Sequence, residues 1–142
     1  MKKFFVSFMG VLGVFSVMNA AELKCDSLEA KVAFAKAHEE LSDSATKTLL
    51  TSGKFEEQYE DGFLSIWFDK GDLVVQAGGE EEGLTTTYSK FSVAKNNKTS
   101  LTCKVHWEAM ESAGGGDGGD TTFAISKDSK GNLVVNIADW IF

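Results

Sequence analysis

The spacing of apolar residues predicts one helix near the start of the chain. Over residues 26–41 apolar side chains recur every three to four positions, which is the period of an α-helix. Asp26 can cap the first free backbone amides, and Glu29 follows three residues later, as in a capping box. The alanines in this segment favour a helix that packs closely. We therefore expect a helix over 26–41.

Farther along, apolar and polar residues alternate with a period of two, which is the period of a β-strand. The alternation is clearest over 100–110, where Cys103 and Val105 fall on one face and Lys104 and His106 on the other. Such a strand has one buried face and one wet face. The segments predicted as strands are 62–69, 73–77, 84–94, 100–110, 121–126 and 133–137, with 54–59 as a weaker candidate. Residues 44–52 fit either a strand or a helix.

The turns between these segments predict how the strands connect. Asp69–Asp72 has the composition of a hairpin turn, and the chain contains no proline, so its turns rely on Gly, Asp and Asn. We expect an α+β fold in which one N-terminal helix packs on an antiparallel β-meander of about seven strands. Residues 21–142 would form this single domain.

The first twenty residues have the pattern of a secretory signal peptide. Lys2 and Lys3 form a basic start, residues 4–18 form an apolar run, and small or polar residues follow at 19–21. The run is shorter than the roughly 20 residues that a membrane-spanning helix needs. We expect cleavage after residue 20 and export to a bacterial periplasm or beyond, so that the mature chain is no integral membrane protein. The alternative is an uncleaved N-terminal anchor.

The two cysteines, Cys25 and Cys103, support the same destination. An exported chain with an even number of cysteines most simply pairs them. We expect a disulfide that fixes the start of the helix to the core face of strand 100–110. The alternative is two buried free thiols.

The net charge of −7 narrows the kinds of partner. A nucleic-acid-binding protein needs clustered positive charge to neutralise phosphates, so we expect no nucleic-acid partner. An acidic surface favours a basic protein or a cation instead.

The order of the turns predicts where the acidic residues gather. A meander sends alternate turns to opposite ends of its sheet. One end would hold the lysine-rich turns, and the other would collect Glu60, Asp61, Glu80, Glu81, Glu82, Glu111, Asp117 and Asp120. We expect binding of a basic protein or cation there, through Glu60, Asp61, Glu80, Glu82, Glu111, Asp117 and Asp120. The alternative is that these turns are merely solvated surface.

Residues 115–120 form the most unusual segment, because they match the first six positions of the G-G-x-G-x-D unit of RTX-type calcium repeats. The resemblance implies calcium bound by Asp117 and Asp120, with Glu80, Glu81 and Glu82 adding oxygens from the neighbouring loop. Only one copy is present, and Thr122 stands where the repeat has an apolar residue. The alternative is that 111–120 is a mobile linker between two strands.

Catalytic motifs are missing from the sequence. It contains no nucleophile elbow and no Cys/His grouping suited to zinc. Glu108, beside Trp107 and His106, is the one carboxylate that suggests acid–base work. We therefore expect a small exported non-catalytic binding or inhibitor-like protein. The alternatives are a hydrolase with an unrecognised carboxylate site, and a structural component of the envelope with a weak calcium site.

Overall fold

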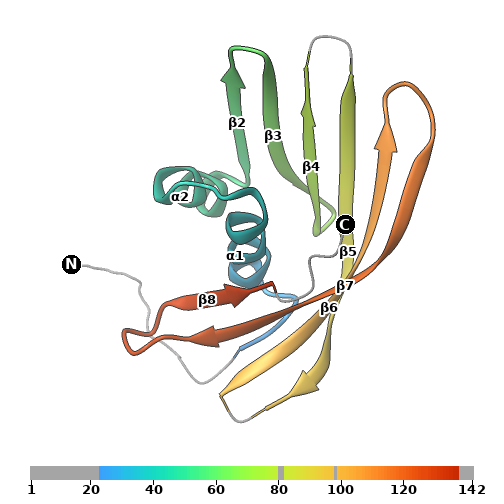
Figure 1. Cartoon of the computed structure of the whole chain (residues 1–142). Helices are drawn as coiled ribbons and strands as arrows, with labels where there is room; N and C mark the ends of the chain where they lie inside the picture. The colour runs from blue at the N-terminus through green and yellow to red at the C-terminus, as the bar shows by residue number, and fades with distance from the viewer. Residues whose placement is uncertain (1–22, 80–81, 98, 138–142) are drawn as a thin grey trace.

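The computed structural model describes residues 23–79, 82–97 and 99–137 (Figure 1). The predicted signal peptide and the chain end at 138–142 lie outside them. The described elements are α1 (Leu28–Glu39), α2 (Asp43–Ser52), β2 (Lys54–Tyr59), β3 (Gly62–Asp69), β4 (Asp72–Gly78), β5 (Gly83–Asn96), β6 (Ser100–Glu111), β7 (Gly116–Lys127) and β8 (Leu133–Asn136). Within the described ranges, no helix has the length and apolar character needed to cross a membrane.

The strands form one antiparallel meander. The seven strands lie in chain order from β2 to β8, and each pairs with its neighbours in sequence. The sheet curls around the helices as a half-barrel (Figure 1). The predicted antiparallel meander is thus confirmed, and its curl gives it a concave inner face and a convex outer face.

The prediction of a single helix was wrong. Residues 43–52 form a second helix, capped by the Ser42 hydroxyl, which accepts a hydrogen bond from the Ala45 backbone N–H at 3.1 Å. Ala45 and Leu49, one helical turn apart, are the buried residues of α2. The other positions are polar or exposed, so the helical period was faint in the sequence. Gly53, in the left-handed region with φ 77°, ends the helix.

The first helix is shorter than predicted. Its cap is Ser27, whose hydroxyl accepts from the Ala30 N–H at 3.1 Å, so Asp26 does not have the predicted role. The helix ends at Glu39, because Glu40 turns into the left-handed region and donates its backbone N–H to the Lys36 carbonyl. Leu41 therefore lies beyond α1, in the connection to α2.

The core lies between α1 and the concave face of the sheet. Phe34 of α1 is fully buried, and its ring centroid lies 5.1 Å from that of Tyr88, 6.1 Å from Phe91 and 4.7 Å from Phe123. Tilted and edge-to-face contacts of this kind stabilise a core beyond its buried area. Phe34 thus joins the helix to β5 and β7.

The predicted disulfide is confirmed. Cys25 and Cys103 are bonded, both are buried, and the bond ties the residues just before α1 to β6. Disulfides persist in oxidising compartments, so this bond fits an extracellular or periplasmic protein.

The predicted linker over 111–120 is mostly strand. β7 begins at Gly116, and its first residues pair with the end of β6, from Gly116 opposite Met110 to Asp120 opposite His106. A Cβ on Gly116 would lie 2.7 Å from the Ala109 carbonyl oxygen, so the absence of a side chain at Gly116 allows β7 to approach β6 closely here. Pairing with β6 therefore overrides the low strand propensity of these glycines.

The pairing of β5 with β6 contains an irregularity. The register between β5 and β6 shifts between Ser89 and Ser92, and again between Val93 and Lys95. Lys90 lies in the left-handed region with φ 56°. Bulges of this kind bend a strand and increase its twist, which favours a curled sheet.

Candidate functional site

Three turns lie side by side at one end of the sheet, the β2–β3, β4–β5 and β6–β7 turns (Figure 1, top). A Cβ on Gly62 would collide with the Gly78 carbonyl oxygen, which shows how closely the first two turns approach. The Ser112 N–H donates to the Gly83 carbonyl oxygen at 2.9 Å, and the Gly83 N–H donates to Ser112 Oγ at 2.9 Å. The predicted gathering of these turns is therefore confirmed.

We call this region the acidic end, defined by the exposed carboxylates of Glu60, Asp61, Glu82 and Glu111. Glu60 and Asp61 form the β2–β3 turn, Glu82 lies in the β4–β5 turn, and Glu111 ends β6. Of the remaining predicted binding residues, Glu80 and Glu81 lie outside the described residues. The described part of these turns contains no lysine.

Asp117 and Asp120 lie in the first half of β7 rather than in a turn. They are three residues apart in a strand, and therefore project from opposite faces of the sheet. The Asp117 carboxylate accepts from the Gly118 backbone N–H at 2.8 Å. The structure thus does not bring these two carboxylates together. Among the described residues, no group of three or more His, Cys, Asp or Glu side chains is arranged to hold a metal ion.

Asp120 instead contacts a histidine on the convex face. Its Oδ1 lies 3.0 Å from His106 Nδ1, while His106 Nε2 lies 3.1 Å from Glu108 Oε2. The hydrogen bond to Asp120, followed by that to Glu108, raises the pKa of His106, and the same bond lowers the pKa of Asp120. Because both ring nitrogens are engaged, this cluster acts as a clamp between β6 and β7.

The convex face does not offer Glu108 the environment of a catalytic acid. Its side chain is 70% exposed, and Trp107, its neighbour in the strand, projects to the concave face. A carboxyl group that serves as a general acid near neutral pH is held in an apolar pocket. The predicted grouping of Glu108 with Trp107 is therefore absent from this face.

A second histidine lies where α1 meets the sheet. His38 Nδ1 lies 2.6 Å from Glu39 Oε2, and its Nε2 lies 3.2 Å from the Tyr88 hydroxyl. Burial, with a contribution from the charge of Glu39, raises the pKa of Tyr88. The sequence placed His38 at the edge of the helix but did not predict its contact with Tyr88, because the two residues are fifty positions apart.

Beyond α1 the concave face becomes exposed. Where α1 covers the sheet, inner positions such as Ile66 and Val105 are fully buried. Toward the acidic end, Tyr59 is 49% exposed and Leu84 is 42% exposed, although both lie on the same inner face. Exposed apolar groups and carboxylates thus share this end of the inner face, while Leu64, which lies opposite Glu57, is buried.

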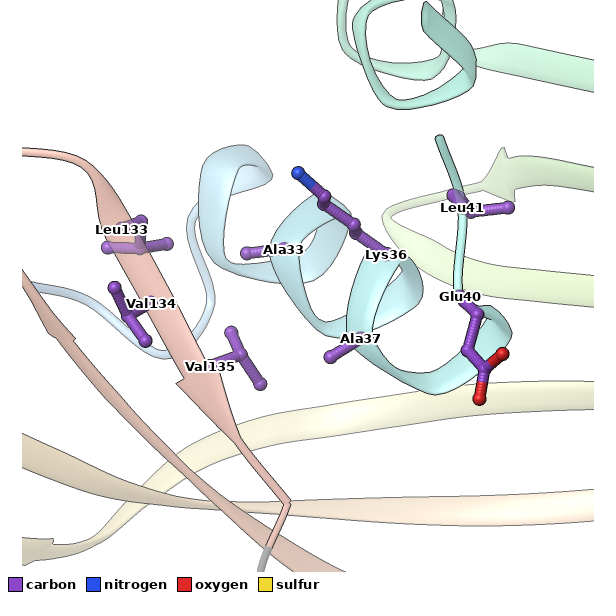
Figure 2. Close-up of a pocket in the computed structure, with 8 residues that line it drawn as sticks. All are labelled: Ala33, Lys36, Ala37, Glu40, Leu41, Leu133, Val134 and Val135. Carbon is purple, nitrogen blue, oxygen red and sulfur yellow. The ribbon is translucent and has the colours of Figure 1, made fainter. Parts of the chain in front are cut away.

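A groove of about 510 Å³ runs between α1 and β8 (Figure 2). Ala33 and Ala37 of α1 point toward Leu133–Val135 across it. Its polar lining is limited to Lys36 and Glu40, and Lys36 Nζ lies 2.6 Å from Asp43 Oδ1. The lining is therefore mainly apolar.

No protein-family model, curated protein or solved structure matches the chain. Two features of the molecule bear on function: the acidic end, and the exposed part of the concave face beside it.

Proposed function

We propose that this chain is a small exported, non-catalytic binding or inhibitor-like protein that engages a basic protein through its acidic end. One observation carries the proposal. Three turns from different parts of the chain lie side by side, and their described residues carry carboxylates without a lysine. Turns held on a rigid sheet are common binding elements.

Electrostatics supports this choice of partner. The chain has a net charge of −7, and the acidic end concentrates part of it on one surface. Such a surface attracts a basic partner and raises its association rate, and salt screens the attraction.

The location that goes with this function is the bacterial periplasm or the extracellular space, after removal of residues 1–20. The leader pattern and the Cys25–Cys103 disulfide support it. The two alternative functions lack a comparable observation in the described residues. Glu108 is exposed, and Asp117 and Asp120 project from opposite faces.

Two matched variants test the proposal. Glu60→Gln with Glu111→Gln removes two charges from the acidic end, and Asp69→Asn with Asp72→Asn removes two from the β3–β4 turn at the opposite end. The titrant is polylysine, at low and at high salt. We expect the first variant to bind roughly three- to tenfold more weakly, as the loss of two exposed charge pairs implies. We expect the second to bind like the unaltered protein.

Equal losses in the two variants would show that net charge, rather than the acidic end, attracts the cation. Binding that is insensitive to salt, or no binding at low salt, would contradict the proposal as a whole.

A further inference from the structure

The exposed part of the concave face combines apolar and acidic groups. Glu57 and Tyr59 of β2 pair with Leu64 and Gly62 of β3, and Leu84 of β5 pairs with Glu111 of β6. These positions share the face that holds the core, as the alternation of each strand requires. Tyr59 and Leu84 are about half exposed, and Glu57 and Glu111 are exposed.

The Tyr59 side chain lies beside one of these carboxylates. The Tyr59 hydroxyl lies 3.4 Å from Glu57 Oε1. Desolvation raises the pKa of Tyr59, and the charge of Glu57 and its hydrogen bond contribute further.

We propose that this concave face docks a basic, amphipathic segment of the partner protein. The lysine or arginine side chains of that segment lie against Glu57 and Glu111. Its apolar side chains cover Tyr59 and Leu84. This inference rests on the proposed function and specifies which surface of the acidic end does the binding.

Charge complementarity argues for this occupant. A segment with both apolar and basic side chains complements apolar groups and carboxylates that share one face, and the carboxylates disfavour an acidic or a wholly apolar segment. The Tyr59 ring offers an amphipathic anchor and a face for a cation. The turn tips offer charge alone, so a partner that binds only there needs no apolar side chains.

Neighbouring residues on the two faces give matched controls. Glu57 faces inward and Glu56 outward on β2, and both are exposed. Leu84 faces inward, and Met110, 61% exposed at the same end, faces outward. The inner-face variant is Glu57→Gln with Leu84→Ser, and the outer-face variant is Glu56→Gln with Met110→Ser. Thermal unfolding of both variants checks that each remains folded.

The probes are a short peptide of lysine and leucine and a peptide of equal charge in which serine replaces leucine. We expect the unaltered protein to bind the leucine peptide more tightly, by about fivefold or more, because apolar area is buried. The inner-face variant should lose this preference, and the outer-face variant should keep it.

This inference would be overturned if the unaltered protein bound the two peptides equally. It would also be overturned if the inner-face and outer-face variants lost the preference for the leucine peptide equally. In either case salt-sensitive binding of the serine peptide, weakened by Glu60→Gln with Asp61→Asn in the β2–β3 turn, would leave the proposed function standing. No binding of either peptide at low salt would overturn both.

Discussion

The indole of Trp107 lies over Gly119, the residue that faces it across β6 and β7. A Cβ on residue 119 would lie 3.5 Å from Trp107 Nε1, an ordinary van der Waals distance. The glycine-rich segment is therefore part of a paired strand that packs on an aromatic side chain.

This relationship predicts that two glycines of the sheet, Gly119 and Gly62, differ in how well they tolerate a side chain. Gly119→Ala should change the free energy of unfolding by less than about 1 kcal/mol, because its Cβ fits. Gly62→Ala should destabilise the protein by about 1–3 kcal/mol, because its Cβ collides with the Gly78 carbonyl oxygen. Denaturant unfolding of both variants gives the comparison. Equal stability would contradict the close approach of the two turns.

The disulfide predicts a large dependence on redox conditions. Cys25 and Cys103 are 78 residues apart in sequence, and closing a loop of that length stabilises a protein by about 4–5 kcal/mol in the chain-entropy model. We expect reductant to lower the denaturant midpoint of the native protein strongly. The Cys25→Ser, Cys103→Ser protein should show the lower midpoint without reductant, and reductant should not change that midpoint. A midpoint that reductant leaves unchanged in the native protein would count against the bond.

The chain's two tyrosines provide a test of the contact between α1 and the sheet. Tyr88→Phe removes the 3.2 Å contact with His38 and should lower the free energy of unfolding by about 1 kcal/mol. Tyr59→Phe removes a 3.4 Å contact at an exposed site and should change it little. Thermal unfolding of the two variants measures the difference. If Tyr59→Phe proves the more harmful, the Tyr88–His38 contact is not the stabilising one.

The clamp between β6 and β7 predicts a pH dependence. The pKa of His106 is raised, so its contribution to stability is fully present below about pH 6.5 and is lost as pH rises through the folded-state pKa. The pKa of Asp120 is lowered, so its contribution is present above about pH 3.8 and is lost as pH falls through its folded-state value. The clamp is therefore most effective between these limits.

An NMR titration of the His106 ring checks this. We expect a midpoint above 6.5 in the native protein. Asp120→Asn should lower it, whereas Asp117→Asn removes a carboxylate that projects from the other face and should leave it nearly unchanged. A native midpoint at or below 6.5 would show that the two carboxylates do not hold the ring.

Calcium tests the resemblance of residues 115–120 to a calcium repeat. Because Asp117 and Asp120 project from opposite faces of β7, we expect calcium to give no increase in melting temperature that depends on both. The measurement compares the native protein with the Asp117→Asn, Asp120→Asn protein. A calcium-dependent increase that the double change abolishes would mean that this segment leaves the strand to bind the ion.

Much of the fold could be predicted because its signals are local. The alternation in 100–110 gave β6 and its two faces, and the two cysteines of an exported chain gave the disulfide. The second helix was ambiguous, because burial of Ala45 and Leu49 alone leaves little periodicity. The start of β7 was missed because pairing partners, which lie outside the local sequence, decide the state of glycines.

The candidate site was predictable to the extent that it follows from topology. Alternation of the turns was enough to bring Glu60 and Glu111 to one end. The exposed concave face was not predictable, because it depends on where α1 ends and on how far the sheet curls. The end of α1 is marked by Glu40 in the left-handed region, a conformation with little signature in the sequence.

The packing of α1 against β8 has a consequence for the order of folding. Every strand pairs with its neighbour in sequence, so the sheet can assemble from local hairpins. The first helix, however, packs against the last strand, across the groove in Figure 2. The contact between α1 and β8 can therefore form only once the C-terminal strand is in place. A chain cut before Leu133 would leave that side of α1 exposed.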